Sequence, residues 1–335
     1  MKKLKIGIAG LGRIGKIHLN NLLELNNVEV IAVMDPSFEA LKYAIGKGVE
    51  SGLQNYKDLL EIKELEAIVI CTPTNTHADY VEIAAKSGKH IFCEKPLDLN
   101  LQRINDVLKV VEKSKIKLMI GFNRRYDNEF CKVKSSVKSG FVGEPYLVKI
   151  TSRDPAAPPI EYIKNSGGLF LDMTIHDFDM ARFIVDKEIQ EVYAKGEAFT
   201  DISISKAGDI DTAVIVLKYT DSTLAIIDNS RKAAYGYDQR LEVFGSKGMV
   251  QANNVMIDNN NLFTQNGVKS SLPMNFFMER YADAYKKEII DFIDSVKNNK
   301  EVSVSGIDGL KSLQIGLAAN KSLKENRPVK VDEIT

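Results

Sequence analysis

The stretch Lys5–Gly15 reads KIGIAGLGRIG and carries the strongest structural signal in the chain. A short apolar run, Ile6 to Ala9, leads directly into a glycine-rich turn, and a helical pattern follows the turn. This spacing matches the GxGxxG fingerprint, in which a strand, a tight turn and a helix N-terminus bring backbone amides to a pyrophosphate. The stretch therefore predicts a dinucleotide-binding unit at the start of the chain.

The positions within this turn have separate expected roles. Gly10 permits the tight turn, Gly12 lets the backbone approach the pyrophosphate, and Gly15 lets the helix pack closely on the strand. Arg13 and Ile14 are expected to line the pyrophosphate. The alternative is a glycine-rich turn that binds no ligand, and the strand, turn and helix in register argue against it.

Asp35 follows the second apolar run, 20 residues after Gly15. A carboxylate at this distance accepts hydrogen bonds from the adenosine ribose and repels a 2′-phosphate. No arginine or lysine occupies the next three positions, 36 to 38, so the sequence favours NAD over NADP. The structural alternative is an aspartate that caps the following helix, and one side chain could serve both ends.

Short apolar runs alternate with amphipathic stretches of helix length throughout the first 122 residues. Runs that are apolar throughout are typical of parallel strands buried on both faces, so residues 1–122 are predicted to form a doubly wound Rossmann domain. The expected strands are Ile6–Ala9, Val28–Met34, Ala67–Cys71, His90–Cys93 and Leu118–Phe122.

Beyond residue 122 the pattern changes to consecutive strand-like runs without helices between most of them. This order predicts an α+β domain over residues 123–335, with a mostly antiparallel sheet and flanking helices. The expected strands are Tyr146–Ser152, Ile189–Phe199, Thr212–Tyr219, Thr223–Ser230 and Arg240–Phe244, and the expected helices are Asn128–Lys138, Leu171–Val185, Phe277–Asn298 and Ile307–Asn326.

A second group of polar residues leaves a strand end near position 71 and enters a helix. Thr72, Pro73, Thr74 and His77 would face the same crevice as the glycine turn and meet the nicotinamide half of the cofactor. The alternative is equally ordinary, because Thr and Pro are common helix-entry residues and His77 could be a surface residue of the first turn.

Lys95 lies in the triplet Glu94-Lys95-Pro96, at the carboxyl end of a predicted strand. Ligands bind at this edge of doubly wound sheets, so Lys95 is a candidate for proton transfer or alkoxide stabilisation. Most lysines are simply solvated, which is the alternative interpretation.

Asp172 and His176 are four residues apart in a predicted helix, so both are expected on one face. A histidine can take the proton of a hydroxyl that is being oxidised, and a carboxylate can orient the imidazole. Asp177 and Asp179 lie in the same turn, which leaves the identity of the carboxylate partner less certain. A surface ion pair or a capped helix start would also explain the pattern.

Composition excludes several other classes of protein. The 335 residues are 44% hydrophobic and 27% charged with a formal net charge of +0, so neither a disordered chain nor nonspecific nucleic-acid binding is expected. No apolar run approaches a membrane span. Three widely spaced cysteines indicate reduced thiols in the cytoplasm, and the four histidines lack metal-ligand spacing, so no metal site is predicted.

Taken together, the glycine fingerprint, the Thr-Pro pair, the Glu94-Lys95-Pro96 triplet and the Asp172/His176 pair resemble the glucose-fructose oxidoreductase, inositol dehydrogenase and MocA family. The resemblance covers nearly the whole chain. Longer strings resemble the inositol 2-dehydrogenases in particular, namely residues 121–126, 153–155, 168–179 and 235–240.

The resemblance implies roles for individual residues. Lys95, Asp172 and His176 would form the catalytic triad, Glu94 would join the cofactor-binding residues, and the Lys95–Pro96 peptide bond is a candidate for the cis form. The open sheet of the second domain would mediate a homotetramer. The substrate would be read by polar side chains through hydrogen bonds to neighbouring hydroxyls, with Arg125, Asp154 and Tyr235 as the main candidates.

These observations lead to the hypothesis of an NAD-dependent oxidoreductase acting on a CH–OH group. It would oxidise one ring hydroxyl of myo-inositol, or of a related cyclitol, to the inosose. The alternatives are a scyllo-inositol or aldose dehydrogenase of the same family, and a regulatory protein that senses NAD and sugar without turnover. An acid and base pair is unnecessary in a sensor, which argues against the last alternative.

Overall fold

The computed structural model describes residues 2–335 and divides them into two compact units. The first unit comprises the chain up to Asn123 together with Asp283–Lys311, and the second comprises Arg124–Ala282 together with Ser312–Thr335. The expected change after residue 122 therefore lies one residue from the observed one. The expectation of an uninterrupted second domain differs from the structure, because the chain returns to the first unit before it ends.

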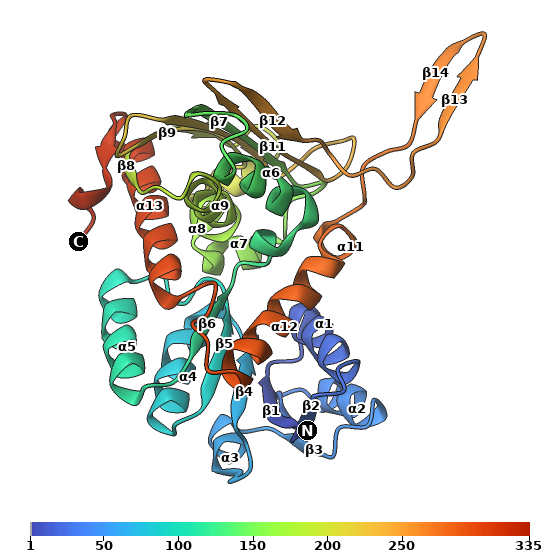
Figure 1. Cartoon of the computed structure of the whole chain (residues 1–335), viewed down its shortest axis with the longest axis vertical. Helices are drawn as coiled ribbons and strands as arrows, with labels where there is room; N and C mark the ends of the chain where they lie inside the picture. The colour runs from blue at the N-terminus through green and yellow to red at the C-terminus, as the bar shows by residue number, and fades with distance from the viewer. Residues whose placement is uncertain (1) are drawn as a thin grey trace. The chain divides into compact units, whose positions relative to one another are not determined.

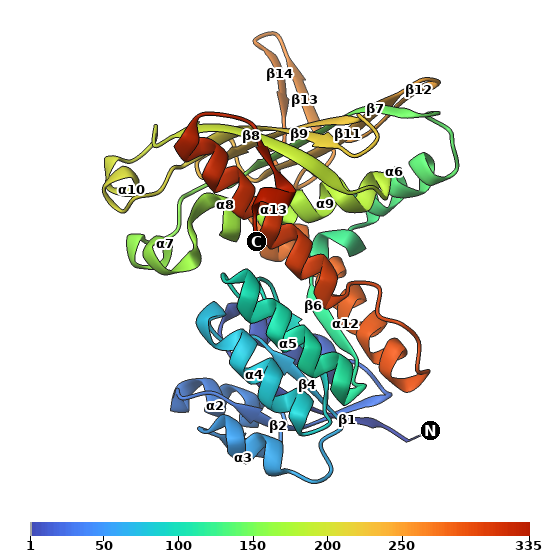
Figure 2. The same cartoon turned by 90° about the vertical axis from the view of Figure 1, so that its left-hand side faces the viewer.

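The first unit contains a six-stranded parallel sheet in the order β3-β2-β1-β4-β5-β6 (Figure 1). This confirms the predicted doubly wound sheet, and each central strand is buried on both faces. Its strands are β1 Leu4–Ala9, β2 Val28–Met34, β3 Ser51–Leu53, β4 Ala67–Ile70, β5 His90–Glu94 and β6 Leu118–Gly121, and its helices include α1 Arg13–Leu23, α2 Phe38–Gly46, α3 Tyr56–Glu61, α4 Thr74–Lys86 and α5 Leu101–Ser114. Helices α4 and α5 lie side by side over the sheet (Figure 2).

The returning segment completes the first unit. Helix α12, Ala282–Lys297, packs beside α1, where the Tyr285 ring meets the His18 ring edge-on at a centroid distance of 5.8 Å. After the helix, the backbone N–H of Ile120 donates to Val304, so this segment also lines β6. The hydrophobic period of this helix predicts that it is helical, but not that it packs on a Rossmann sheet whose sequence pattern ends 160 residues earlier.

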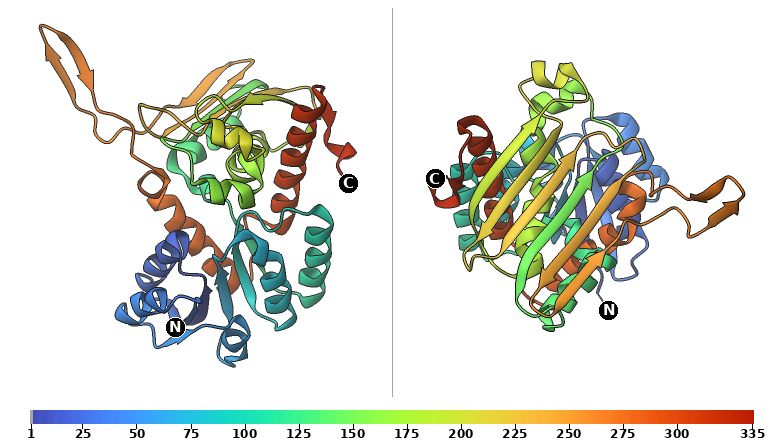
Figure 3. Two further views of the ribbon diagram at one scale, coloured as in Figure 1. Left: turned by 180° about the vertical axis from the view of Figure 1, so that it is seen from behind. Right: turned by 90° about the horizontal axis from the view of Figure 1, so that it is seen from above.

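A seven-stranded sheet in the order β12-β11-β7-β10-β9-β8-β15 forms the second unit's centre (Figure 3). All its strand pairs are antiparallel except β7 with β10, which confirms the mostly antiparallel prediction. The strands are β7 Pro145–Arg153, β8 Ile189–Glu197, β9 Thr212–Tyr219, β10 Leu224–Ser230, β11 Asp238–Gly245, β12 Gly248–Ala252 and β15 Val329–Lys330.

The strands of this sheet alternate between buried and exposed side chains. In β9 every second residue from Ala213 to Tyr219 is buried, whereas Val214 and Val216 are exposed. Helices pack on the buried face, and within the second unit no helix of the described chain lies over the other face (Figure 3, right). These helices include α6 Asn128–Lys138, α9 Ile175–Val185 and α13 Gly306–Glu325.

Several short elements were not anticipated from the sequence. They are too short to show a period, and most are exposed. These elements are the edge strand β3, the 3₁₀ turns at Asn123–Tyr126 and Val331–Glu333, the helices α7 Ile160–Ser166 and α10 Ile202–Lys206, strand β12, and a projecting hairpin of β13 Asn261–Thr264 and β14 Gly267–Ser270. The predicted helix Phe277–Asn298 is present but is divided at Tyr281 into α11 Phe277–Arg280 and α12.

Candidate active site

The glycine turn after β1 has the geometry of an anion cradle. Gly10 has φ +89°, and a Cβ there would lie 2.6 Å from the Cys71 carbonyl oxygen. A Cβ at Gly15 would lie 1.9 Å from the carbonyl oxygen of Gly10, whereas one at Gly12 would meet nothing within 4 Å. Gly12 also caps α1 without a side-chain acceptor. The turn therefore combines two positions that only glycine fits with open space over the start of α1, beside Arg13 and Ile14.

Asp35 joins the glycine turn to the start of α2. Its Oδ2 accepts a hydrogen bond of 2.7 Å from the backbone N–H of Leu11, and its Oδ1 accepts one of 2.8 Å from Ser37. Ser37, rather than Asp35, is the residue that caps α2. Each carboxylate oxygen keeps a second lone pair, so both expected functions, structural support and ribose binding, are compatible with this geometry.

The segment after β4 divides the predicted cofactor residues into two groups. Thr72, Pro73 and Thr74 lie at the entry to α4, where the hydroxyl of Thr72 is 2.6 Å from that of Thr76. His77 is instead only 2% exposed, and both of its ring nitrogens face backbone carbonyls. Burial lowers the pKa of His77. The structure thus places His77 beneath the segment rather than on its surface.

The Glu94-Lys95-Pro96 triplet lies at the carboxyl end of β5, as expected, and the Lys95–Pro96 peptide bond is cis. The Glu94 carboxylate is turned towards α1, where its Oε1 lies 2.7 Å from Nε2 of His18. Lys95 is half-buried and follows the last residue of the strand. Lys95 therefore lies between Glu94, which contacts His18, and Pro96, whose carbonyl oxygen is 2.8 Å from Nδ1 of His77.

Asp172 and His176 do not share one continuous helix, which corrects the sequence-based expectation. Asp172 is the last residue of α8, Gly168–Asp172, and His176 is in the first turn of α9. The backbone N–H of Thr174 donates to Leu169, five residues earlier, so the turn between the helices is wider than an α-helical turn. Such wide turns often occur at functional sites. The helical period assumed for Leu171–Val185 could not reveal this widening.

The Asp172 carboxylate is held by two side chains from distant parts of the chain. Its Oδ1 accepts a hydrogen bond of 2.8 Å from the Tyr162 hydroxyl, and its Oδ2 lies 3.4 Å from Nη1 of Arg231. Arg231 is 1% exposed and also faces Asp209 at 3.7 Å. The guanidinium and the carboxylate therefore form a charge-assisted hydrogen bond that helps to orient Asp172.

Asp177 and Asp179, the other carboxylates of this turn, are each paired with an arginine. Arg124 donates to Oδ1 of Asp177 at 2.6 Å, and Asn229 donates to its Oδ2 at 2.9 Å. Arg125 donates to both oxygens of Asp179, at 2.6 and 2.8 Å. Asp172, Asp177 and Asp179 each lie next to an arginine, so these pairings do not identify the carboxylate that serves His176. They give Arg125, a predicted substrate-binding residue, a structural partner.

The two other predicted substrate-binding residues flank the end of β7. Burial raises the pKa of Asp154 to about 6, and the neighbouring Arg124 and Arg231 partly oppose this shift. Tyr235 donates from its hydroxyl to Asp238 at 2.6 Å. Asp154 is therefore close enough to sense the charges around Asp172, whereas Tyr235 belongs to a separate, more exposed group of hydrogen bonds.

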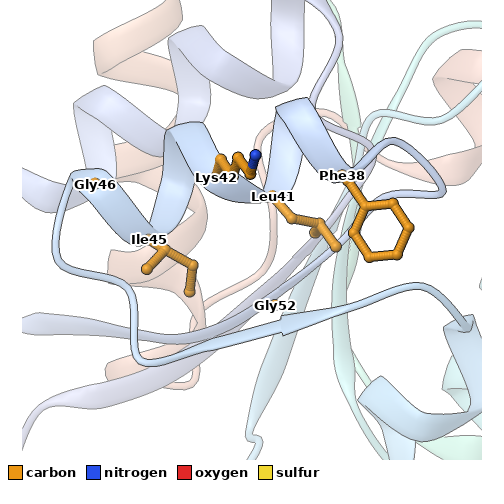
Figure 4. Close-up of a pocket in the computed structure, with 6 residues that line it drawn as sticks. All are labelled: Phe38, Leu41, Lys42, Ile45, Gly46 and Gly52. Carbon is orange, nitrogen blue, oxygen red and sulfur yellow. The ribbon is translucent and has the colours of Figure 1, made fainter.

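A shallow apolar groove of about 500 Å³ lies elsewhere in the first unit, between α2 and β3 (Figure 4). None of the predicted site residues lines it. Its lining residues are Phe38, Leu41, Lys42, Ile45, Gly46 and Gly52. Lys42 is the one charged residue among those that line the groove, so the groove offers no pair of acid and base for a reaction.

Several residues of the site were missed by sequence reasoning. They are held by partners far away in the chain: His18 meets Glu94 across 76 positions, and Arg231 meets Asp172 across 59. Arg231 directly follows a predicted strand, and this position at a strand end is the one signal that could have drawn attention to it. A lone histidine in the fingerprint helix gives no comparable signal.

The fold and these residues define a dinucleotide-binding oxidoreductase of two units. Two family models match the chain: "Oxidoreductase family, NAD-binding Rossmann fold" over residues 4–122, and "GFO/IDH/MocA C-terminal domain" over residues 130–251. The chain belongs to the GFO/IDH/MocA family of oxidoreductases.

Full-length relatives support the same assignment. The chain is 47% identical to the myo-inositol 2-dehydrogenase of Thermotoga maritima, with 99% of both chains covered, and 44% identical to the inositol 2-dehydrogenase of Rhizobium meliloti, with 98% of this chain and 99% of that protein covered. Among solved structures, a probable dehydrogenase from Thermotoga maritima matches with a TM-score of 0.97 at 47% identity, over 99% of this chain and 100% of that chain.

A further solved structure contains ligands. The scyllo-inositol dehydrogenase from Lactobacillus casei, with bound cofactor NAD(H) and scyllo-inositol, matches with a TM-score of 0.93 at 33% identity, over 99% of this chain and 100% of that chain. Among residues 2–335, no helix is both long enough and apolar enough to cross a membrane.

Proposed function

We propose that this protein oxidises a ring hydroxyl of myo-inositol, or of a related cyclitol, to the corresponding inosose with NAD as the hydride acceptor. The observation that carries the proposal is the 47% identity, over 99% of both chains, to a protein named myo-inositol 2-dehydrogenase. The presence of Lys95, Asp172 and His176 supports turnover rather than sensing, because a protein that only binds its ligands needs no acid and base.

The residues of the first unit fit the dinucleotide. The open space over Gly12 and the N-terminus of α1 suit a pyrophosphate, and the Asp35 carboxylate suits unphosphorylated ribose hydroxyls. Arg13, Ile14 and the segment from Thr72 to Thr74 complete the proposed cofactor-binding set. When bound, NAD supplies the nicotinamide ring that accepts the hydride.

The proton chemistry is assigned to three side chains. We infer that His176 and Lys95 share the removal of the hydroxyl proton, and that Asp172 orients the imidazole of His176. Tyr162 and Arg231 hold the Asp172 carboxylate, so it is available in one orientation. Arg125, Asp154 and Tyr235 are proposed to read the hydroxyls of the ring, as far as their structural partners leave hydrogen-bonding capacity.

The experiment that tests the function is NAD reduction by the purified protein with a panel of inositol isomers, glucose and xylose. The expected result is the highest kcat/KM with myo-inositol. Preference for scyllo-inositol or for an aldose would replace the proposed substrate within the same chemistry. Binding of NAD without turnover on any member of the panel would favour the sensor and contradict the proposal.

We further propose that the open face of the second unit's sheet forms a homotetramer. Val216 in β9 and Ile226 in β10 are cross-strand neighbours on this face, and both are exposed, as is Leu224. An exposed apolar sheet face of this kind is typical of a protein–protein interface. Light scattering should give the mass of four chains, and Val216→Lys with Ile226→Lys should reduce it. Ile45→Lys, exposed on α2, is the matched control.

A cytoplasmic location completes the proposal. Cys71, Cys93 and Cys131 form no disulfide bond with one another, and a protein of this kind suits a reducing compartment. The balanced net charge of +0 offers no field for nucleic acid, so the expected partners are a small polyhydroxylated substrate and further copies of this chain. Fractionation of cells that produce the tagged protein tests the location, and recovery in a membrane or secreted fraction would contradict it.

A further inference from the structure

Two buried histidines from different helices hold the residues on either side of Lys95. His18 of α1 bonds the Glu94 carboxylate at 2.7 Å, and His77 of α4 bonds the Pro96 carbonyl oxygen at 2.8 Å. The two histidines are 0% and 2% exposed, respectively, so neither presents its ring to a ligand at the surface. We propose that His18 and His77 are positioning residues that fix the backbone of Lys95 from both sides. This inference rests on the proposed role of Lys95 in the reaction.

His77 makes a second bond that links the two cofactor segments. Its Nδ1 faces the Pro96 carbonyl oxygen, and its Nε2 faces the Thr72 carbonyl oxygen at 2.7 Å. A carbonyl oxygen only accepts, so both bonds exist together only when both ring nitrogens carry a proton. A neutral ring keeps one of the two. The positively charged form of His77 is therefore the form that ties the end of β4 to the end of β5.

The charges around His77 act in both directions. Burial lowers its pKa, whereas the hydrogen bonds to Pro96 and Thr72 and the nearby Glu94 carboxylate raise it. Lys95 is the charged neighbour that lowers it. Burial is the largest of these effects and lowers the pKa of His77 on balance, so the tie through both nitrogens forms as the pH decreases. The Glu94 carboxylate, which His18 holds, favours this charged form of His77.

On the other side of Lys95, the ring of His18 has little freedom to move. It packs edge-on against Phe92 of β5 at 5.0 Å and against Tyr285 of α12 at 5.8 Å. The Glu94 carboxylate lies close over β6, because a Cβ at Gly121 would be 2.9 Å from its Oε2. Strands β5 and β6 and helix α12 therefore surround the hydrogen bond between His18 and Glu94.

Glu288 of α12 faces the same ring and explains which carboxylate takes the bond. Its Oε1 lies 3.9 Å from Nε2 of His18, and it is completely buried. Burial and the nearby Glu94 charge raise the pKa of Glu288 well above its ordinary value, which favours its neutral form. A neutral Glu288 does not compete for the His18 proton, which leaves Glu94 as the acceptor.

Fixing the backbone on both sides matters because a lysine side chain has four rotatable bonds and a displacement of about 1 Å can cost roughly 100-fold in rate. The sequence places His18 eight residues from Gly10 and His77 in the helix after β4. Both helices begin at the proposed cofactor site, so the two histidines connect the cofactor-binding turns to the lysine.

The test uses His18→Asn and His77→Gln in the full-length protein, with His90→Asn as the control. His90 lies at the opposite end of β5, where its Nδ1 accepts from the backbone N–H of Lys117 at 3.1 Å. The expected result is a fall in kcat of about tenfold or more for the first two variants, with a smaller change in KM for inositol and none for the control.

Each variant is then combined with Lys95→Ala, because a positioning residue acts through the residue that it positions. With Lys95 removed, the histidine substitutions should cost little further kcat. An equal cost in both backgrounds would show a general structural role and overturn the proposal, as would unchanged kcat in the single variants. If a variant does not fold, the charge state of His77 provides the second measurement.

Nuclear magnetic resonance of the parent protein labelled with ¹⁵N-histidine shows how many ring nitrogens of His77 carry a proton, with the His77→Gln spectrum as the assignment. We expect one N–H group at pH 7, because burial lowers the pKa of His77, and a second N–H group as the pH is decreased further. A single N–H at every pH at which the protein stays folded would overturn the tie between Thr72 and Pro96. This measurement needs no substrate, so its failure is distinguishable from a failure of the proposed reaction.

Discussion

The two units present their site residues in different ways. In the first unit the expected ligand contacts come from the backbone around Gly10, Gly12 and Gly15, with Asp35 as the main charged group. In the second unit they come from a buried network of charges in which Arg124 meets Asp177 and Arg231 meets Asp172. A site formed by backbone atoms depends on the absence of side chains at a few positions. A site formed by charged side chains depends on many partners that are distant in the chain.

The difference predicts that the two units tolerate substitution differently. A substitution at Gly10 or Gly15 acts locally, because it adds atoms where a neighbouring carbonyl oxygen lies within 3 Å. A substitution in the charged network also acts on every group that the lost charge had neutralised, since an unpaired charge is costly in a buried site. The following predictions use one or both units to test this contrast.

The largest expected effect is on the chemical step. Lys95→Ala in the first unit and His176→Ala in the second should each reduce kcat by about 10² to 10⁴, the range usual for positioned acids and bases. Steady-state kinetics and NAD titration should show this loss with nearly unchanged affinity for NAD. If either variant keeps near-normal kcat, that residue has no catalytic role and the proton chemistry belongs to the other unit alone.

The next effect concerns stability. Arg124→Met leaves the fully buried Asp177 without its cation, and breaking a buried pair costs about 3–5 kcal/mol. Denaturant unfolding should show a lower free energy of unfolding for this variant. Arg327→Met, which removes an exposed pair with Glu333, is the matched control and should unfold close to the parent. Equal costs for the two variants would contradict the contrast between buried and exposed charges.

Much of the first unit could be predicted because each of its roles demands a particular residue at a particular spacing. The five expected strands are all present, and Gly10 and Gly15 occupy positions that no larger residue fits. The edge strand β3 was missed, since three residues show no period. The role of His77 was also missed, because the sequence shows that it enters a helix but not that both of its nitrogens face carbonyls.

The second unit was predictable in architecture but less so in its site. Consecutive strand-like runs indicated the mostly antiparallel sheet. The turn between Asp172 and His176, in contrast, depends on a single wide hydrogen bond that leaves no trace in hydrophobic spacing. Arg231 and Tyr162 reach Asp172 from 59 and 10 positions away. Pairings across such separations are set by strand order, which sequence spacing alone does not give.

Cofactor preference tests the first unit alone. NAD should support turnover at least tenfold better than NADP, because the Asp35 carboxylate accepts ribose hydroxyls and repels a phosphate. Kinetics with both cofactors measure this directly. Asp35→Ser with Pro36→Arg should move the preference towards NADP. The loss of the Leu11 and Ser37 hydrogen bonds in this variant calls for a measurement of its unfolding midpoint as a control. Equal rates with both cofactors in the parent would remove Asp35 from its proposed role.

The smallest expected effect is a pH dependence that belongs to the second unit. Burial raises the pKa of Asp154 from 3.8 to about 6, so this side chain loses half of its charge near pH 6. If the charged form accepts hydrogen bonds from substrate hydroxyls, kcat/KM should fall by about half on this account as the pH decreases to 6. The pH profile of Asp154→Asn should lack this step while keeping any step due to His176.

The ionisation of Asp154 should affect stability in the opposite direction. As the pH rises, kcat/KM should increase, whereas the contribution of this group to the free energy of unfolding should decrease. A raised pKa means that the folded protein binds the Asp154 proton more tightly than the unfolded chain does. The contribution of this group to the free energy of unfolding is therefore greatest below about pH 4 and is lost as the pH rises through about 6. Denaturant midpoints between pH 4 and 7 should decline less steeply, or rise more, for Asp154→Asn than for the parent. Identical pH dependence in the two proteins would mean that burial does not raise the pKa of Asp154 in the folded protein.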